Sequence, residues 1–401
     1  MFSLFAIYAM LLLLLLLLSG NVAANVMDMG VNGGVSWVSD ADGVGMDKVY
    51  SEYIAQHRKS FANHSEFLMR RNIFIDNYKR IQDINGKNLS WRAGINMFTD
   101  MTPEEVAQVL NPVVGVNYVK IKTGMSGSTE TKSPQSGLYV KRLTAWFMKK
   151  RASCETIDWV SKRKVSPVKM QGSCGSCWMF AANDALESSW AIQRDLDMSK
   201  AKDNQIFSVQ QAGECAFDHW RRLNPSFNGN ICGGGWSTLV FDTVTETNDY
   251  VVLKESAFPY QGRHLGYCPA YTYQSSRTQK HKWRYSGGYD GIVSGEYNTA
   301  NGMLLKKMLR KRPQPVYLLA DANFMYYQSG IYQTTGITNN GVNHAVLAVG
   351  FKECGGERYW TIKNSWSKNW GESGYMRLAM TDDAYGTANM YNTVMNTPEH
   401  I

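Results

Sequence analysis

The sequence predicts an α+β fold, in which helices come early in the chain and strands come late. A helical segment is expected over residues 47–85, and an apolar run that favours another helix covers residues 178–186. Runs typical of buried strands follow at residues 316–320, 345–351 and 359–363. Helices and strands that are separated along the chain in this way favour α+β packing over a regular βαβ alternation.

The composition allows more than one compact part and gives no argument for a nucleic-acid partner. The chain has 401 residues, of which 44% are hydrophobic and 19% are charged, and this is ample for more than one core. The formal net charge is +8, but residues 152–401 hold 25 Lys and Arg against 22 Asp and Glu. Because this longer part is nearly balanced, its charge does not favour nucleic-acid binding.

Residues 1–24 have the pattern of a secretory signal peptide. An apolar run over residues 4–18 includes eight consecutive leucines, and the small residues Val22-Ala23-Ala24 offer a cleavage site after it. The run is short for a membrane span, but no Lys or Arg precedes it, so an uncleaved anchor is the alternative. Residues 25–45 are rich in Gly, Val and Asn and are expected to form a linker. No later segment is long and apolar enough to span a bilayer, so we expect no membrane association after signal removal.

The predicted helix over residues 47–85 carries a regular stripe. Six of its residues recur at steps of three or four and lie along one helical face: Glu66, Arg70, Phe74, Asn77, Ile81 and Asn85. Taken alone, this is the pattern of an ordinary amphipathic helix, in which Glu66 and Arg70 can pair. The segment 94–100, with the sequence G-I-N-M-F-T-D, follows the stripe. Asn63 and Asn88 each begin a glycosylation sequon in this region.

Residues 111–151 are expected to form an exposed linker, because residues 111–140 are rich in Gly, Ser, Thr and Lys and show little periodicity. Two basic groups, Lys141-Arg142 and Lys149-Lys150-Arg151, lie near the end of this linker. Exposed basic linkers are natural sites of proteolytic nicking, and a merely solvated run of charge is the alternative.

The stretch from residue 171 to residue 178, Q-G-S-C-G-S-C-W, contains the candidate nucleophile. Cys177 stands where a Gly/Ser loop meets an apolar helix, and the positive end of a helix dipole lowers a thiol pKa. A thiol nucleophile also needs a base and a group that orients the base, and His344 and Asn364 are the candidates. The Cys-x-x-Cys pair has three other interpretations, which are a redox dithiol, half of a zinc site and two structural half-cystines. No second pair of ligands at short spacing is visible for zinc.

Several motifs, in the same order along the chain, resemble those of papain-like cysteine proteases. They are C-G-S-C-W at 174–178, C-G-G-G-W at 232–236, N-S-W at 364–366 and W-G-E-S-G-Y at 370–375. The stripe of the predicted helix and the following G-x-N-x-F-x-D resemble the inhibitory propeptide of the cathepsin L-like branch. The resemblance implies a papain-like two-domain fold, with a helical left domain, a β-barrel-like right domain and an active-site cleft between them. A small helical propeptide domain would precede it.

The resemblance also implies a domain plan and roles for individual residues. Residues 46–110 would be a cathepsin propeptide inhibitor domain, residues 111–151 a linker with the processing region, and residues 152–401 the peptidase domain. Cys177 would be the nucleophile and His344 its acid–base partner, with Asn364 orienting the imidazole. Gln171 would stabilise the oxyanion, and Trp366 would shield the His–Asn hydrogen bond.

The seven cysteines predict one free thiol, because a secreted chain tends to pair the others. The resemblance implies the disulfides Cys174–Cys232 and Cys215–Cys268. The family's usual third bridge ends in a cysteine near the C-terminus, which this chain lacks. We therefore expect a non-standard bridge between the remaining Cys154 and Cys354, with two unpaired thiols as the alternative.

The resemblance places a specificity pocket for the second residue before the cleaved bond. Its walls would be Trp236, Leu319, Asn343 and Ala345, its floor would lie near Thr393, and Gly235 would offer backbone hydrogen bonds to the substrate. None of these residues is acidic, and burying an unpaired guanidinium is costly, so we expect a preference for Leu, Val or Phe over Arg.

The expected function is that of a cysteine endopeptidase made as a secreted zymogen, without a cofactor or a metal. Its partners would be protein and peptide substrates, its own propeptide as inhibitor and cystatin-like inhibitors, and the enzyme would be a monomer. It would work in an acidic lysosome- or vacuole-like compartment or outside the cell. The alternatives are a catalytically impaired homologue that serves as a binding or storage protein, and a thiol oxidoreductase that uses Cys174 and Cys177.

Four residues depart from the family pattern. Met170 and Ser367 replace the usual Asn and Gly, while Asn183 and Asp184 stand where the first helix is normally apolar. A buried carboxylate at Asp184 would need a partner.

Overall fold

The computed structural model describes most of the region in which the sequence predicts folded domains. The described residues are 43–111, 154–202, 205–247, 250–269, 278–284, 292–294, 299–334, 341–382, 386–391 and 393–401. The expected signal peptide, nearly all of the linker that follows it, residues 112–151 of the processing region and the first two residues of the expected peptidase domain lie outside these ranges. The chain divides into two units, residues 1–52 and 53–401, and the described part of the first unit is the beginning of one helix.

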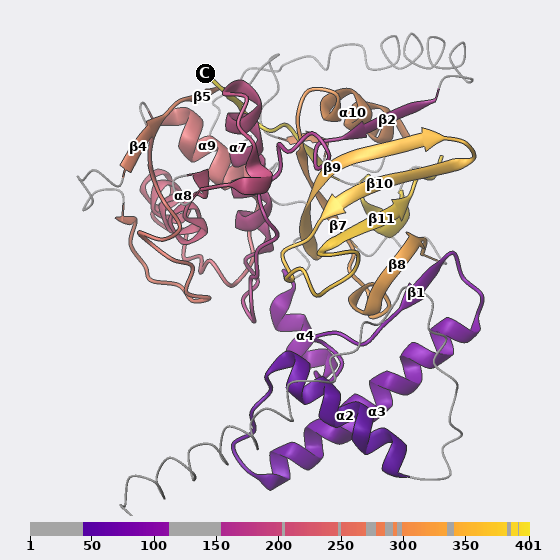
Figure 1. The fold of residues 1–401 in the computed structure, drawn as a ribbon. Helices are drawn as coiled ribbons and strands as arrows, with labels where there is room; N and C mark the ends of the chain where they lie inside the picture. Colours follow the sequence, from indigo (N-terminus) through magenta and orange to yellow (C-terminus); the bar gives the residue numbers. More distant parts are fainter. Residues whose placement is uncertain are drawn as a thin grey trace, which may run out of the picture. The chain divides into compact units, whose positions relative to one another are not determined.

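The N-terminal region contains two helices where one was expected. Helix α2 (Gly43–His57) ends before α3 (His64–Gly86), and the shorter α4 (Pro103–Val109) follows later (Figure 1). Arg58 has φ of 51°, a left-handed conformation that cannot continue a helix. Asn63 then caps α3, because its side-chain oxygen accepts a hydrogen bond from the N–H of Glu66 at 3.0 Å. These local features end one helix and start the next inside a stretch with continuous helical periodicity.

A short strand joins this N-terminal region to the large sheet of the chain. Strand β1 (Trp91–Ala93) pairs antiparallel with β8 (Tyr327–Tyr332), and Trp91 lies opposite Gly330. Gly330 has φ of 95°, and a Cβ atom there would lie 2.5 Å from the carbonyl oxygen of Ser90. Glycine is therefore required for this pairing, which extends the sheet by one edge strand.

The described strands form one large sheet and two small pairs. The large sheet has nine strands in the order β1-β8-β11-β10-β9-β7-β12-β6, with β2 paired to β9. Its neighbours are antiparallel except for β11 and β8, which are parallel. The other strands of this sheet are β2 (Glu155–Asp158), β6 (Ile292–Ser294), β7 (Gln314–Leu318), β9 (His344–Cys354), β10 (Glu357–Lys363), β11 (Tyr375–Ala379) and β12 (Thr393–Met395). In the two small pairs, β3 (Tyr250–Leu253) pairs with β4 (Thr278–His281), and β5 (Trp283–Arg284) pairs with β13 (Glu399–His400).

Helices form a separate layer beside this sheet. Figure 1 shows α7 (Cys177–Gln193), α8 (Val209–Leu223) and α9 (Ser237–Glu246) grouped together, with α10 (Thr299–Leu309) against the sheet. Short 3₁₀ helices are η1 (Met198–Lys200), η4 (Phe324–Tyr326) and η5 (Thr387–Asn389). Helix α7 is buried along almost its whole length and packs against both β9 and α9. The predicted α+β class with a helical and a sheet domain is confirmed.

Three disulfides stabilise the peptidase region. The structure bonds Cys174 to Cys232, Cys215 to Cys268 and Cys154 to Cys354, and leaves Cys177 as a free thiol. The third bond follows from strand register, because β2 pairs with β9 so that Glu155 lies opposite Glu353. Cys154 and Cys354, the next residues beyond this pair, face each other with a Cα–Cα distance of 4.4 Å, which is suitable for a disulfide.

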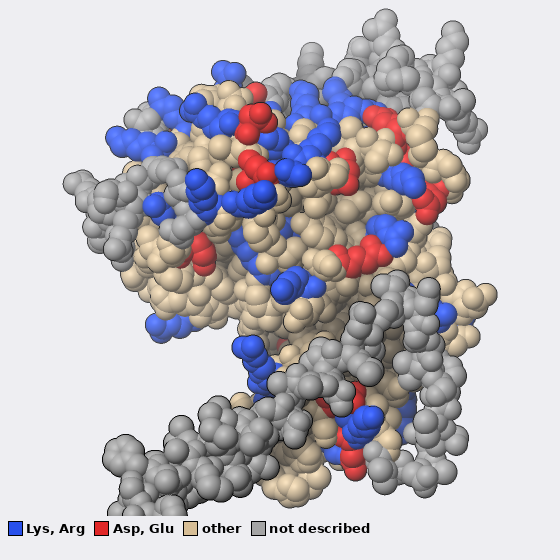
Figure 2. All heavy atoms as spheres, in the orientation of Figure 1, with Lys and Arg blue, Asp and Glu red and all other residues tan. Residues whose placement is uncertain are grey.

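Opposite charges are interspersed on the surface around β2, β9 and α10. Figure 2 shows Lys and Arg gathered over this part of the molecule, with Asp and Glu among them. Ion pairs there join Arg310 to Glu155 at 2.6 Å and Lys306 to Glu353 at 2.6 Å. Among the described residues, no helix combines the length and the apolar character that crossing a bilayer requires.

Candidate active site

Cys177 and His344 each begin an element, and the packing of these elements brings them together. Cys177 is the first residue of α7, and His344 is the first residue of β9, against which α7 packs. The sulfur of Cys177 accepts a hydrogen bond from the N–H of Ala345 at 3.3 Å. Both side chains are fully buried. The thiol therefore lies at the positive end of a helix dipole, beside the first residues of the strand that carries the imidazole.

Asn364 and Trp366 fix the ring of His344. Nε2 of His344 lies 2.8 Å from Oδ1 of Asn364, and the ring stacks on Trp366 with a centroid distance of 4.4 Å. Because an amide oxygen only accepts, Nε2 carries the proton and Nδ1 is left as an acceptor. Nδ1 is buried and has no hydrogen-bond partner within the described residues. It is the nitrogen available to a proton from the thiol.

Burial keeps both members of the pair neutral in this form of the protein. It raises the pKa of the Cys177 thiol to about 12, against the opposing effect of the N–H groups of Ala345 and Trp178. It also lowers the pKa of His344 to about 4, against the hydrogen bond to Asn364. Desolvation disfavours each charged form, so a thiolate–imidazolium pair needs access to water that this form withholds.

The side-chain amide of Gln171 is held in one orientation. Its Oε1 accepts hydrogen bonds from Oγ of Ser365 at 2.6 Å and from Nε1 of Trp366 at 3.2 Å. Its Nε2 donates to the carbonyl oxygens of Val109 at 2.8 Å and Cys174 at 2.9 Å. The amide of Gln171, which was expected to stabilise the oxyanion, thus already binds carbonyl oxygens.

Residues 109–111 run across the site and contact both sides of it. The N–H of Asn111 donates to the carbonyl oxygen of Asn343 at 2.8 Å, and its side-chain Nδ2 lies 3.4 Å from the carbonyl oxygen of Gly235. Val109 and Asn111 are almost completely buried. A Cβ atom on Gly175 would lie 2.9 Å from the carbonyl oxygen of Leu110, so the glycine of the loop permits this close approach.

The expected pocket residues gather around a tyrosine that the sequence analysis did not name. The hydroxyl of Tyr317 donates to the carbonyl oxygen of Gly235 at 2.8 Å, and its ring packs on Trp236 with a centroid distance of 4.5 Å. In the sheet, Tyr317 lies opposite Ala345 on one side and Thr393 on the other. The side chain of Thr393 is outside the described part of the structure. Leu319 directly follows β7 and Asn343 directly precedes β9. Asn343 exchanges hydrogen bonds with Ala320.

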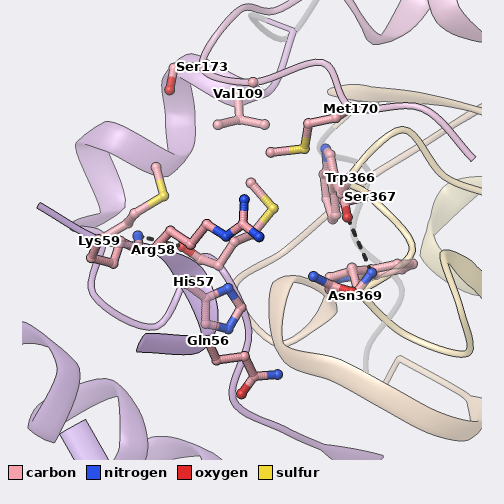
Figure 3. A pocket seen from close by; sticks show the side chains of 14 residues that line it. Gln56, His57, Arg58, Lys59, Val109, Met170, Ser173, Trp366, Ser367 and Asn369 are labelled. Atoms are coloured by element: carbon pink, nitrogen blue, oxygen red, sulfur yellow. Dashed lines mark hydrogen bonds between the residues drawn. The ribbon is translucent and has the colours of Figure 1, made fainter. Parts of the chain in front are cut away.

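A cavity of about 570 Å³ lies next to Trp366 and is also lined by Val109 and Met170. In Figure 3, Met170 and Trp366 face His57 and Arg58 from opposite sides of it. Met170 is 44% exposed. The N-terminal region therefore fills the site tightly at residues 109–111 and leaves open space beside Trp366.

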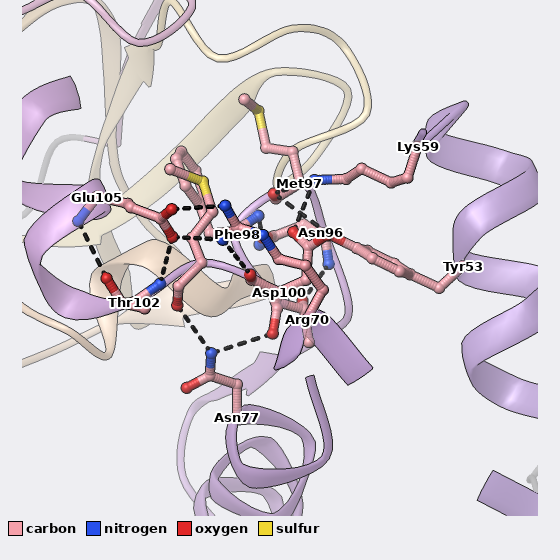
Figure 4. Close-up of polar contacts among 12 residues, drawn as sticks. Tyr53, Lys59, Arg70, Asn77, Asn96, Met97, Phe98, Asp100, Thr102 and Glu105 are labelled. Atoms are coloured by element: carbon pink, nitrogen blue, oxygen red, sulfur yellow. Dashed lines mark hydrogen bonds and ion pairs between the residues drawn. The ribbon is translucent and has the colours of Figure 1, made fainter. Parts of the chain in front are cut away.

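An ion-pair network holds the N-terminal region in its fold (Figure 4). Both terminal nitrogens of Arg70 lie 2.6 Å from the carboxylate oxygens of Glu105, and one also donates to the carbonyl oxygen of Asp100 at 3.1 Å. The carboxylate of Asp100 accepts from Lys59 at 2.6 Å and from the hydroxyl of Tyr53 at 2.7 Å. Arg70 of the predicted stripe thus connects α3 to the segment that leads to residues 109–111.

Phe98 connects the N-terminal region directly to the site. Its ring is fully buried and meets Trp366 edge-on at a centroid distance of 4.9 Å. The neighbouring Asn96 donates a hydrogen bond from Nδ2 to the carbonyl oxygen of Met325 at 2.8 Å. Both residues belong to the G-x-N-x-F-x-D segment that the sequence analysis identified.

The bonding of Cys174 excludes the redox interpretation of the two neighbouring cysteines. Cys174 is bonded to Cys232, so it cannot form a dithiol with Cys177 in this structure. Across the described residues, no group of three or more His, Cys, Asp and Glu side chains is arranged to hold a metal ion.

Comparisons with known proteins assign the N-terminal region and the remainder of the chain to two known families. Residues 153–395 match the family described as papain family cysteine protease, and residues 50–106 match the cathepsin propeptide inhibitor domain (I29). The chain is 32% identical to cysteine proteinase 3 of Solanum lycopersicum, over 84% of this chain and 82% of that protein. It is 30% identical to a cathepsin L-like proteinase of Fasciola hepatica, over 83% of this chain and 88% of that protein.

Solved structures of related precursors superimpose on most of the chain. A recombinant stem bromelain precursor superimposes with a TM-score of 0.64 and 27% identity, covering 88% of this chain and 98% of its own. Digestive procathepsin L2 of Tenebrio molitor superimposes with a TM-score of 0.64 and 26% identity, covering 88% and 99%.

Proposed function

Because this chain belongs to the papain family of cysteine proteases and carries a cathepsin propeptide inhibitor domain, we propose that it cleaves peptide bonds internally through Cys177, His344 and Asn364. The observation that carries this proposal is the bond from Nε2 of Gln171 to the carbonyl oxygen of Val109 at 2.8 Å. A backbone carbonyl oxygen is held there by the amide that would bind the oxyanion of a scissile peptide.

The proposed reaction divides into two steps that the same residues serve. The thiolate of Cys177 attacks the carbonyl carbon, and His344 gives its proton to the leaving amine, so that an acyl-enzyme remains. Water, deprotonated by His344, then attacks the acyl carbon and restores the thiol. Gln171 and the N–H of Cys177 stabilise the negative oxygen in both steps, and Asn364 keeps the imidazole in its orientation.

Residues 46–110 act in this proposal as the propeptide inhibitor. Val109 occupies the side-chain amide of Gln171, and the adjoining Asn111 occupies the backbone carbonyl oxygens of Asn343 and Gly235. A substrate would use these same groups. Burial beneath these residues also keeps Cys177 and His344 neutral. Cleavage within residues 111–151 followed by release of the propeptide would open the site to water and to substrate.

The remaining proposals concern the cellular route. Residues 1–24 would be removed as a signal peptide, and residues 25–45 would be a linker. The exposed Asn63 and Asn88 would carry glycans in the secretory pathway. The mature enzyme would be a monomer in an acidic vacuole-like compartment or outside the cell, open to cystatin-like inhibitors. It would prefer an apolar residue two positions before the cleaved bond.

Hydrolysis of an internally quenched peptide tests the proposal. The full chain activated in acid should cleave this peptide, while Cys177→Ala and His344→Ala, processed in trans by another protease, should have no measurable activity. Cys177→Ser should stay folded, because the change is small. Undiminished hydrolysis by Cys177→Ala would show that the nucleophile is assigned wrongly.

A further inference from the structure

Four charged side chains form a buried cluster between α7 and the end of β10. They are Lys169, Asp184, Glu187 and Lys363, with exposed side-chain fractions of 13%, 6%, 0% and 0%. Two are cations and two are anions, so the cluster is electrically balanced. Buried charges are costly unless they are paired and hydrogen-bonded, so this group needs a structural explanation.

Asp184 stands between the two lysines. Its Oδ1 lies 2.7 Å from Nζ of Lys169, and its Oδ2 lies 2.6 Å from Nζ of Lys363. Burial alone would raise the pKa of Asp184, but the two ammonium groups outweigh burial and hold that pKa below its ordinary value. The carboxylate therefore stays charged in the acidic range in which a free Asp becomes protonated.

Glu187 has a different set of partners. It accepts hydrogen bonds from Lys169 at 2.8 Å, from the N–H of Phe207 at 2.8 Å and from Nδ2 of Asn183 at 3.1 Å. It therefore fastens α7 within the helical layer. Lys363, from the sheet, instead bonds Asp184 and also donates to Oγ of Ser166 at 3.1 Å. Asp184 is thus the carboxylate that joins the helical layer to the end of β10.

Lys363, Lys169 and Asp184 each lie on a segment that also carries a residue of the proposed site. Lys363 directly precedes Asn364, and Lys169 lies two residues before Gln171. Asp184 lies seven residues after Cys177 in α7, or about 10 Å along the helix axis. One carboxylate therefore links the segments that carry the nucleophile, the oxyanion donor and the residue that orients the imidazole.

We propose that Asp184 is a positioning residue, which holds the segments of Cys177, Gln171 and Asn364 in catalytic register through Lys169 and Lys363. This inference rests on the proposed function. The departure of Asp184 from the apolar family pattern is thereby explained by a role in geometry, since a buried ion pair by itself adds little net stability.

The test separates a positioning role from charge balance. Asp184→Asn leaves the ammonium of Lys363 buried without its carboxylate, so this variant should be both less stable and less active. Asp184→Asn combined with Lys363→Met removes that charge as well and leaves the balanced pair of Lys169 and Glu187. All variants are made as full chains and activated in trans, and kcat, KM and the melting temperature are measured on each.

The double variant carries the decisive result. We expect its melting temperature to return close to that of the wild type while kcat stays roughly ten- to a hundredfold lower, because a misplacement of about 1 Å can cost a hundredfold in rate. KM should change far less than kcat. Recovery of kcat together with stability would overturn the proposal and leave Asp184 with charge balance alone, as would an unchanged kcat in Asp184→Asn.

A second measurement reads the geometry of the site without substrate. The rate at which iodoacetamide alkylates Cys177 in the activated enzyme should remain high in acid for the wild type. In the double variant its pH midpoint should move towards about 8.5, the value of a free thiol. An unchanged midpoint would contradict displacement of Asn364.

Glu353→Gln provides the matched control. It removes the ion-pair partner of Lys306, whose side chain is only 11% exposed. Glu353 lies on β9, nine residues or about 30 Å from His344. This variant should lose stability and keep kcat. If the wild type itself shows no activity that depends on Cys177, the proposed function fails, and that outcome is distinct from any result with Asp184.

Discussion

The carbonyl oxygen of Val109 lies 2.8 Å from Nε2 of Gln171 and accepts a hydrogen bond from it. The same amide is fixed from its other side by Ser365 and Trp366, so its donor cannot turn away. The inhibitory segment and the proposed transition state therefore compete for one preorganised donor. In the proposed function, inhibition and catalysis would therefore be coupled through Gln171.

Replacing Gln171 should damage catalysis strongly. Gln171→Ala removes one donor to the oxyanion, and we expect kcat/KM to fall roughly 100- to 1000-fold, or about 2.7–4 kcal/mol. Steady-state hydrolysis by the activated enzyme measures this. Gln314→Ala is a suitable control, because Gln314 is equally buried but bonds Met308 and Arg312 in the sheet domain. A similar loss in both variants would attribute the effect to general destabilisation.

Inhibition by the propeptide should weaken in acid through Glu105. The hydrogen-bonded ion pair with Arg70 lowers the pKa of Glu105 below its ordinary value of 4.5. Because the folded pKa is the lower one, the pair stabilises the propeptide fully above about pH 4.5, and this contribution is lost as the pH falls through the folded pKa. The inhibition constant of the propeptide added in trans should therefore stay nearly constant between about pH 7 and pH 5 and rise as the pH falls from about 5 to 3.

Glu105→Gln isolates this ion pair. Glutamine can preserve the capping box that residue 105 forms with Thr102, while the charge is lost. The variant propeptide should inhibit less well at pH 7 and should lack part of the pH dependence. Asp83→Asn is the control, because its pair with Lys87 is exposed. Inhibition that strengthens as the pH falls from about 5 to 3 would contradict the account.

A buried histidine pair should make the peptidase domain less stable in acid. Nδ1 of His281 lies 3.1 Å from Nε2 of His400, and burial lowers their pKa values to about 3 and about 4. Since both folded values lie below 6.5, the stability that the neutral pair contributes is complete above about pH 6.5 and is lost as the pH falls towards 4 and 3. The slope should reach up to about 1.4 kcal/mol per pH unit for each histidine.

His281→Phe tests this pair, because the surroundings of His281 include the rings of Trp190, Phe207 and Trp283. In a full chain made inactive by Cys177→Ser, urea unfolding of the Phe variant should depend less on pH between 6.5 and 4. An unchanged slope would show that another group takes up the protons.

The specificity pocket should accept apolar side chains. The rings of Trp236 and Tyr317 pack against each other beside Gly235, and the described pocket residues are uncharged. A peptide library cleaved by the activated enzyme should favour Leu, Val or Phe two positions before the scissile bond. A clear preference for Arg there would show that the pocket residues are assigned wrongly.

The residues that lie in contiguous motifs were predictable, and those defined by long-range contacts were not. Cys177, His344 and Asn364 stand in motifs that retain their order along the chain, and the structure places Asn364 on His344. The need of Asp184 for a partner could be inferred from its place in an apolar helix. The identity of that partner, Lys363, could not, because it lies on a strand far away in sequence.

Local backbone features explain the other differences. The break between α2 and α3 depends on the left-handed Arg58 and the cap at Asn63, which leave the helical periodicity unchanged. Strand β1 has three residues and owes its existence to pairing with β8, so a pattern of period two could not reveal it. Tyr317 is important through what it contacts and belongs to no motif.

Labelling with an epoxide-type thiol inhibitor, before and after acid activation, tests the central claim most directly. The account predicts that the full chain reacts slowly, because Cys177 is buried beneath residues 109–111 and burial raises its pKa to about 12. After activation, one equivalent of inhibitor should bind, and peptide mass spectrometry should locate it on Cys177 as activity disappears. Complete loss of activity with the label on another residue, or with Cys177 unmodified, would contradict the account.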